Sequence, residues 1–158
     1  MYYNTSDDLN IAMSLKKFAS LLILEKNGKV LLIRRFNTGY EDGKYTLPSG
    51  KVDEGETFTD AAIREALEEV NAEISHSNIN SVHVLHRKKD DVFWIDNFFL
   101  CKKWNNEIKN AEPHKCDDLK WFDIENLPSN TIPFIKHALE QVFFHKKSYS
   151  EYGWNGEE

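Results

Sequence analysis

Three glutamates near the middle of the 158-residue chain have the spacing of a divalent-cation site. Glu65, Glu68 and Glu69 stand at positions i, i+3 and i+4, so on an α-helix they share one arc of the surface. Like charges at this spacing repel one another, by about 0.2–0.5 kcal/mol for each exposed pair. A hard cation such as Mg²⁺ would relieve that repulsion, because it prefers carboxylate oxygens. An ordinary solvent-exposed acidic face is the alternative for these three residues taken alone.

The glutamates belong to a longer pattern of fixed spacing. Gly50 is followed after five residues by Glu56, and after seven more by the run Arg64-Glu65-Ala66-Leu67-Glu68-Glu69-Val70-Asn71-Ala72. This pattern resembles the Nudix box of the Nudix hydrolase family, and every charged position matches. Asn71 stands where the family has glycine. Asparagine tolerates the left-handed conformation better than most residues, so we expect the end of the helix to keep its geometry.

The resemblance implies a hydrolase that cleaves a nucleoside diphosphate linked to another group, using Mg²⁺ or Mn²⁺ and an activated water. By similarity, Glu68 and Glu69 are metal ligands. Glu65 is either a further ligand or the group that accepts the proton of the water. The backbone carbonyl of Gly50 is an additional expected ligand, since glycine permits close approach.

Three other residues belong to the expected catalytic site. Arg64 would pair with Glu56 and orient the catalytic loop, which suits the bidentate geometry of arginine. A plain surface ion pair is the alternative. Glu112 resembles the extra metal-binding or base-positioning glutamate of the triphosphatase branch of the family, and an ordinary solvated loop glutamate is equally compatible with the sequence.

Two substrate signatures of the family are absent from this chain. Members that act on dinucleoside polyphosphates carry a tyrosine beyond the box, near the place of Lys88, Lys89 and Asp90 here. Members that act on ADP-ribose carry a proline where Arg87 stands. The remaining branch, the MutT type, hydrolyses nucleoside triphosphates, including oxidised or non-standard ones, to nucleoside monophosphate and pyrophosphate. A hydrolase of another diphosphate, such as a nucleotide sugar or a pterin triphosphate, and a non-catalytic nucleotide-sensing module are the alternatives.

Five residues are candidates for substrate contacts: Arg34, Arg35, Tyr40, Lys51 and Asp96. The three cations could bind phosphates, although each could equally be a solvated surface cation. Tyr40 could stack on a base. Asp96, or Asn97 on the opposite face of the same strand, could hydrogen-bond the edge of a base. An aromatic strand such as this one is more often part of a core than of a pocket.

The elements that must position these residues can be read from the hydrophobic pattern. Asn27-Gly28 predicts a tight hairpin between two strands, because both turn positions need positive φ. The full set of expected elements is strands at 18–24, 30–35, 45–47, 81–87, 92–102 and 119–122, and helices at 58–70 and 132–144. This order predicts an α/β domain, with a Nudix-like mixed sheet sandwiched between helices in α/β/α layers.

The helix at 58–70 carries most of the box. Thr57 is a plausible N-cap, and Asn71 is a plausible left-handed end. A helical wheel places Glu69 toward solvent and leaves Ala61 and Ala62 beside the acidic arc with open space above it. The wheel assigns the buried face to four residues: Ile63, Ala66, Leu67 and Val70.

Composition bounds the setting in which such an enzyme would work. The net charge of −6 disfavours non-specific binding to nucleic-acid polymers or membrane surfaces. We therefore expect a small-molecule nucleotide as the partner, with a metal ion between it and the acidic protein. Cys101 and Cys116 cannot make a disulfide framework and fit a reducing, cytoplasmic compartment. A homodimer is compatible with the sequence. The expected division is a lead-in at 1–16, the Nudix domain at 17–146 and a tail at 147–158.

Overall fold

Strand β1 (Lys16–Lys26) runs through the centre of the molecule and is covered on both faces. The computed structural model describes residues 16–156, so the lead-in expected at 1–16 lies almost wholly outside the described residues. The six consecutive residues from Ala19 to Leu24 are buried. Successive side chains of a strand point to opposite faces, so an unbroken buried run of this kind needs a partner on each side.

The strands form a mixed sheet in the order β3-β2-β1-β6-β5-β8, with β4 paired to β1 and β7 paired to β2. Strand β1 pairs with β6 in parallel and with β2 and β4 in antiparallel fashion. The strand bounds are Lys29–Arg35 (β2), Tyr45–Thr46 (β3), Ser49–Lys51 (β4), Ile79–Lys89 (β5), Val92–Cys101 (β6), Cys116–Asp123 (β7) and Tyr149–Tyr152 (β8).

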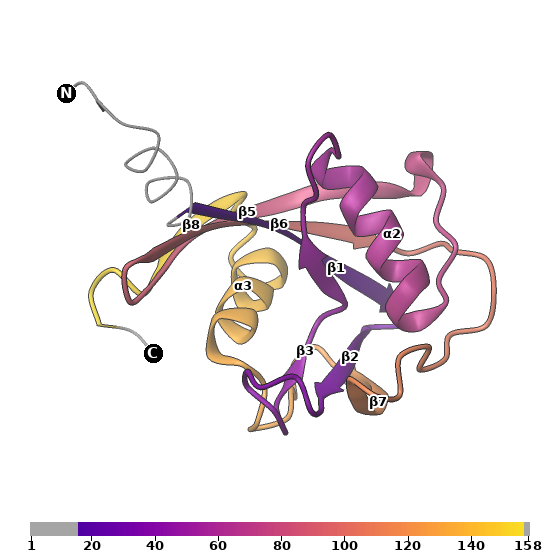
Figure 1. The fold of residues 1–158 in the computed structure, drawn as a ribbon. Coiled ribbons are helices and arrows are strands. Elements are labelled where there is room, and N and C mark those ends of the chain that lie inside the picture. The colour runs from indigo at the N-terminus through magenta and orange to yellow at the C-terminus, as the bar shows by residue number, and fades with distance from the viewer. Residues whose placement is uncertain (1–15, 157–158) are drawn as a thin grey trace.

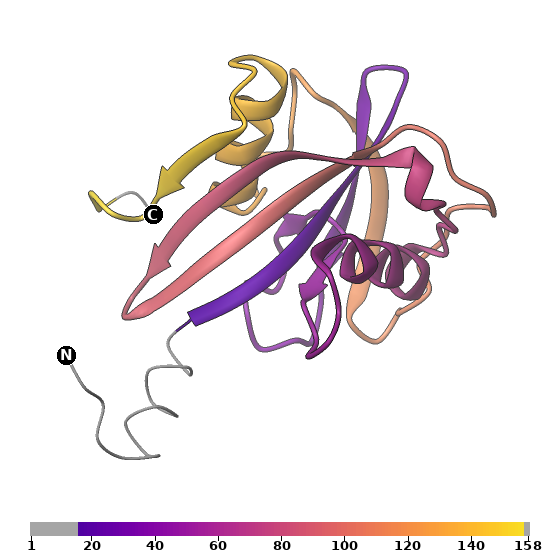
Figure 2. The ribbon, with the colours of Figure 1, turned by 90° about the horizontal axis from the view of Figure 1, so that it is seen from above.

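Helices α2 (Phe58–Val70) and α3 (Pro133–Phe143) lie on either side of β1, as Figures 1 and 2 show. A single 3₁₀ turn, η1 (His76–Asn78), leads into β5. This arrangement confirms the expected α/β domain with a mixed sheet between helices. The Asn27-Gly28 hairpin is also confirmed, with φ of 54° and 75°.

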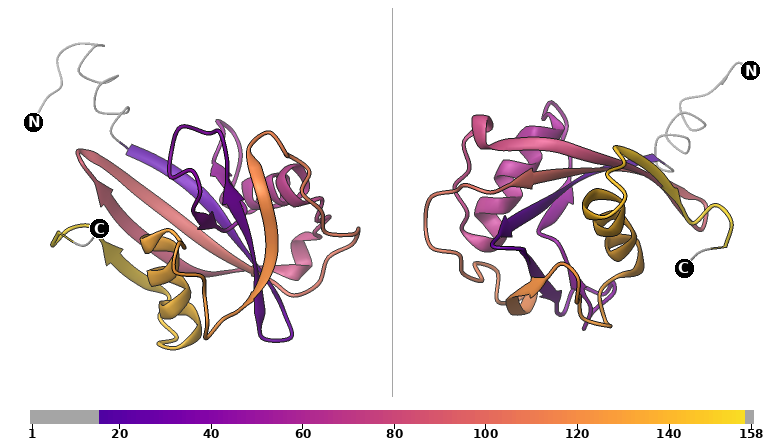
Figure 3. Two further views of the ribbon diagram at one scale, coloured as in Figure 1. Left: turned by 90° about the horizontal axis from the view of Figure 1, so that it is seen from below. Right: turned by 180° about the vertical axis from the view of Figure 1, so that it is seen from behind.

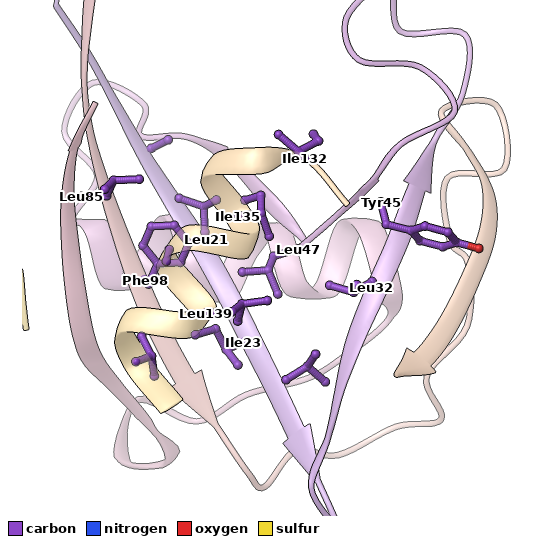
Figure 4. Close-up of a cluster of buried hydrophobic side chains, with 14 residues drawn as sticks. Leu21, Ile23, Leu32, Tyr45, Leu47, Leu85, Phe98, Ile132, Ile135 and Leu139 are labelled. Carbon is purple, nitrogen blue, oxygen red and sulfur yellow. The ribbon is translucent and has the colours of Figure 1, made fainter. Parts of the chain in front are cut away.

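Two hydrophobic clusters hold the layers together. On one side of β1, Leu21 and Ile23 pack with Ile135 and Leu139 of α3 (Figure 4). On the other side, Leu22 and Leu24 pack with the alanines of α2. The alternation of side chains along β1 therefore fastens both helices to the same strand.

The ends of α2 are those that the sequence predicts. The hydroxyl of Thr57 accepts a hydrogen bond from the backbone N–H of Asp60, at 3.1 Å. Asn71 ends the helix in the left-handed region, with φ of 61°. Its backbone N–H donates to the carbonyl of Leu67, at 3.1 Å.

The predicted buried face of α2 is partly wrong. Leu67 is 48% exposed, whereas Ala61 and Ala62, which the wheel places beside the acidic arc, are buried. The helix lies close to β1, since the hydroxyl of Ser20 donates to the carbonyl of Phe58 at 2.6 Å. Small side chains allow this approach, so the alanines face the sheet and Leu67 is turned toward solvent.

The C-terminal segment adds an element that the sequence did not predict. Residues Tyr149–Tyr152 form β8, which pairs in parallel with β5 at the outer edge of the sheet. His83 of β5 contacts the hydroxyl of Ser150 through Nε2 at 2.8 Å and the carbonyl of Lys147 through Nδ1 at 2.7 Å. Among residues 16–156, no helix is long and apolar enough to cross a membrane.

Candidate active site

An acidic cavity of about 330 Å³ lies beside α2. Four predicted metal-binding residues line it together: Glu65, Glu68, Glu69 and Glu112. Ser49 of β4 and Arg35 of β2 line it as well, so four separate parts of the chain meet here. The fold therefore brings the carboxylates of α2 and of a distant loop to one place.

Glu69 is partly buried, which corrects the expectation that it faces solvent. Its Oε2 accepts a hydrogen bond from the backbone N–H of Ser49, at 2.7 Å. Burial raises the pKa of Glu69 to about 8, and the nearby charges of Glu65 and Glu112 raise it too, against the opposing effect of the Ser49 hydrogen bond. This carboxylate is thus held in a position where its negative charge is poorly compensated.

Arg64 and Glu56 form the expected bidentate pair. Nε and Nη2 of Arg64 donate to the two carboxylate oxygens of Glu56, at 2.8 and 3.0 Å. This contact holds the pKa of Glu56 below its usual range. Arg64 also donates to Glu65 at 2.6 Å, and to the carbonyl of Lys51 at 3.1 Å. One guanidinium group therefore ties α2 to the loop that precedes it.

Gly50 lies directly against Glu65. A Cβ atom at position 50 would stand 1.8 Å from Oε1 of Glu65. The backbone at Gly50 is not in the left-handed region, so the glycine is required by close approach and not by its φ angle.

The loop between β6 and β7 delivers Glu112 to the acidic cavity. It passes the C-terminal end of α2, as both views of Figure 3 show. The side-chain amide of Asn71 donates to the carbonyl of Glu107, at 2.9 Å. The backbone N–H groups of Lys109 and Ala111 donate to carbonyls in the last turn of α2, at 3.1 and 3.0 Å. The loop thus satisfies carbonyl groups that the helix end would otherwise leave unpaired.

Replacing Asn71 by alanine is expected to lower the free energy of unfolding by about 1–2 kcal/mol, because alanine is strained at positive φ and lacks the amide that bonds the loop. Glycine at the same position keeps the backbone conformation and loses only the side-chain bond, so its effect should be smaller. Urea denaturation of the two variants measures the difference. Equal losses would show that the left-handed conformation contributes nothing.

A second, larger cavity of about 650 Å³ adjoins the acidic one, and Arg35 and Ser49 line both. We call it the aromatic cavity, after Tyr40, Trp94 and Phe134 in its lining. Its volume is that of an ordinary small-molecule site. Four of the five predicted substrate contacts line it: Arg35, Tyr40, Lys51 and Asp96.

Arg34, the fifth candidate, is placed elsewhere. It is not among the residues that line either cavity, and its Nε donates to Asp117 at 2.7 Å. Arg35 is held inside instead, because its Nε donates to the carbonyl of Tyr40 at 2.6 Å and its guanidinium lies 5.3 Å from the Tyr40 ring. The two neighbouring arginines point to opposite faces of β2, as the pleat of a strand requires.

Asp96 is not free to read a base. It is 1% exposed, and its carboxylate is engaged by Arg87 of β5 at 2.6 and 3.3 Å. Arg87 is itself 6% exposed and lines the aromatic cavity, a position that is not predicted from the sequence. The signal was present in the alternation of β5, where His83, Leu85 and Arg87 share the buried face. An arginine on such a face needs an acidic partner.

The acidic cavity fits a hard divalent cation by the chemistry of its donors. Its carboxylates are oxygen ligands, and Gly50 lies directly against one of them, Glu65. Burial raises the pKa of Glu65 as it does that of Glu69, so a bound cation would stabilise the ionised form of both carboxylates. Within residues 16–156, no three potential ligands are already gathered around one point. Arg64 now bonds Glu65 and reaches Glu68 at 3.4 Å.

Comparison with known proteins gives one consistent result. A model of the NUDIX domain matches residues 15–142. The crystal structure of a MutT NUDIX hydrolase from Burkholderia pseudomallei superimposes with a TM-score of 0.74 at 27% identity, covering 80% of this chain and 98% of that one.

Several curated proteins are similar in sequence. An RNA pyrophosphohydrolase of Wolbachia pipientis subsp. Culex pipiens is 26% identical over 137 residues, covering 77% of this chain and 83% of the relative. An ADP-ribose pyrophosphatase of Methanocaldococcus jannaschii is 31% identical over 106 residues, or 67% of this chain and 61% of the relative. An oxidized purine nucleoside triphosphate hydrolase of Danio rerio is 29% identical over 118 residues, or 73% and 72%.

Proposed function

Since this chain belongs to the NUDIX domain family of pyrophosphate-bond hydrolases, we propose that its substrate is a nucleoside triphosphate, including oxidised or non-standard ones. The products would be a nucleoside monophosphate and pyrophosphate, and the reaction would depend on Mg²⁺ or Mn²⁺. The similarity to an oxidized purine nucleoside triphosphate hydrolase supports this substrate class.

The observation that carries the proposal is the junction of the two cavities. The acidic cavity suits a phosphate chain together with its cation, whereas the aromatic cavity suits a nucleoside. Ser49 and Arg35 line both, so a single nucleotide would extend from one into the other. A chain of net charge −6 places several cations, among them Lys17, Lys51 and Arg87, in the cavity that would receive the substrate.

Glu68, Glu69 and the carbonyl of Gly50 would hold the cation, with Glu65 or Glu112 as further ligands. When bound, the cation neutralises phosphate charge and makes water more acidic. Glu65 is suited to accept the proton of the attacking water, since burial raises its pKa and makes it a stronger base than an exposed glutamate. The water oxygen bonds to phosphorus as the anhydride bond breaks, and the pyrophosphate leaves with the electron pair. Arg64 fixes the position of Glu65 relative to the loop of Gly50, because it donates hydrogen bonds to Glu65 and to the carbonyl of Lys51.

The experiment is a screen of nucleoside triphosphates, oxidised nucleoside triphosphates, nucleotide sugars, ADP-ribose and 5′-triphosphorylated RNA, read by phosphate and pyrophosphate release. We expect turnover of nucleoside triphosphates with Mg²⁺ or Mn²⁺ and none after removal of the metal with EDTA. Re-addition of the metal should restore activity. Turnover of another class alone, or undiminished turnover in EDTA, would contradict the proposal.

A further inference from the structure

Arg87 is a buried cation whose orientation is fixed from three sides. Its Nε and Nη2 donate to the two carboxylate oxygens of Asp96, at 2.6 and 3.3 Å. The ring of Trp94, its cross-strand neighbour on β6, lies 4.8 Å from the guanidinium carbon. The ring of Phe134 on α3 lies 4.0 Å from it. A guanidinium group held in this way is pre-organised, so little conformational entropy is lost when it binds a ligand.

The pair with Asp96 leaves hydrogen-bond donors unused. A guanidinium group has five N–H donors, and Asp96 occupies one fork of two nitrogens. Within residues 16–156, Asp96 is the sole hydrogen-bond partner of the Arg87 side chain, and the one buried side-chain nitrogen or oxygen without a partner is Oε1 of Gln141. Nη1 of Arg87 therefore reaches open space. That space is the aromatic cavity and a smaller neighbour of about 280 Å³, both of which Arg87 lines.

We propose that Arg87 selects the base of the nucleotide, by donating from Nη1 and Nη2 to two adjacent acceptors in the plane of the base. Guanine offers such a pair in O6 and N7, the commonest specific partner of arginine in nucleic-acid recognition. Cytosine offers another in O2 and N3. Adenine and uracil place a donor beside each corresponding acceptor, so neither presents two adjacent acceptors with a carbonyl among them. Asp96 is then the positioning residue that holds the reading arginine.

This inference rests on the proposed function, because it assumes that a nucleotide lies with its phosphates in the acidic cavity. The shared residues Ser49 and Arg35 mark the phosphate end of the aromatic cavity. Arg87 lines the cavity together with Trp94 and Phe134, away from the carboxylates of α2, which suits the end that receives the base. Tyr40 supplies a further ring for stacking in the same cavity.

The test measures binding without hydrolysis. Affinities of GMP, CMP, AMP and UMP are determined in the absence of metal, for the wild-type protein, for Arg87→Lys and for the double variant Arg87→Met/Asp96→Asn. Lysine keeps a positive charge beside Asp96 but lacks the planar fork. The double variant removes the pair without leaving a buried charge uncompensated, and so guards against unfolding. Circular dichroism and thermal unfolding establish that both variants are folded.

We expect the wild-type protein to bind GMP or CMP roughly 10- to 100-fold more tightly than AMP and UMP, and both variants to lose this preference. The GMP and CMP arms tell a guanine reader from a cytosine reader. Equal affinity for all four, or no binding of any, would overturn the proposal. An equal loss of affinity for all four nucleotides in the Arg87→Lys variant would also overturn it, because that result would mean that Arg87 contacts the phosphate and not the base. If the base preference is present but nucleoside triphosphates are not hydrolysed, the proposed function is wrong, whereas the role of Arg87 in base recognition is supported.

Discussion

Replacing Glu69 by glutamine is expected to reduce kcat by roughly 10³-fold while the protein stays folded. The carboxylate lies in the acidic cavity with Glu65 and Glu112, and its Oε2 is held by the backbone N–H of Ser49. Glutamine has nearly the same shape and can accept the same hydrogen bond, but it lacks the charge that a cation requires. Steady-state kinetics with saturating Mg²⁺ measure the loss, and Mn²⁺ titration followed by electron paramagnetic resonance should show weaker metal binding.

The same variant gives an independent check in metal-free buffer. Burial raises the pKa of Glu69 to about 8, so the folded state disfavours the charged carboxylate. The free energy of unfolding contributed by this group therefore falls as the pH rises from the ordinary glutamate range to about 8. Glutamine removes this effect, and the variant should be at least as stable as the wild type at neutral pH in EDTA. Glu125→Gln, at an exposed position outside both cavities, is the matched control and should change neither property. Normal turnover in the Glu69 variant, or its unfolding, would contradict the assignment.

Features that depend on neighbouring residues could be predicted from the sequence. The Asn27-Gly28 hairpin and the left-handed Asn71 follow from backbone preferences of single residues, and the structure has both. The bidentate pair of Arg64 and Glu56 follows from the resemblance to the Nudix box, and the structure has it. In each case the interacting groups are close along the chain, so tertiary packing does little to alter the local geometry.

The rotation of α2 against the sheet could not be predicted in the same way. A helical wheel weighs side chains by hydrophobicity and therefore places Leu67 inside. The structure buries Ala61 and Ala62 instead, because the helix approaches β1 closely enough for Ser20 to bond its first turn. The consequence for the site is large, since this rotation turns Glu69 from solvent toward Ser49.

The Arg87–Asp96 pair depends on the register of two strands. A two-residue turn between β5 and β6 pairs Lys89 with Val92, and this register places Arg87 opposite Trp94 and diagonal to Asp96. The sequence predicts a shorter first strand, at 81–87, and a four-residue turn at 88–91, which would not place Arg87 and Asp96 diagonally across the two strands. The sequence therefore leaves Asp96 as a candidate for hydrogen-bonding a base, whereas in the structure its carboxylate orients Arg87.

Replacing Gly50 by alanine is expected to reduce kcat by roughly 100-fold with little change in stability. The new Cβ would stand 1.8 Å from Oε1 of Glu65, which is the far end of a flexible side chain and not part of the backbone. Glu65 can therefore move away at small energetic cost, and it loses its 2.6 Å contact with Arg64 in doing so. Because φ at position 50 is outside the left-handed region, alanine introduces no backbone strain. The free energy of unfolding should stay within about 1 kcal/mol of the wild-type value.

A double-mutant cycle shows whether Gly50 acts through Glu65. Glu65→Ala should reduce kcat on its own, since it removes the group that would accept the proton or bind the cation. In that background the side chain that Cβ displaces is already gone, so Gly50→Ala should cause little further loss. Strongly non-additive effects on kcat would mean that the glycine exists to make room for the glutamate. If the two losses in kcat instead multiply independently, Gly50 has a role separate from Glu65. Its backbone carbonyl is the expected additional metal ligand, and Mn²⁺ binding to the Gly50→Ala variant would test that role.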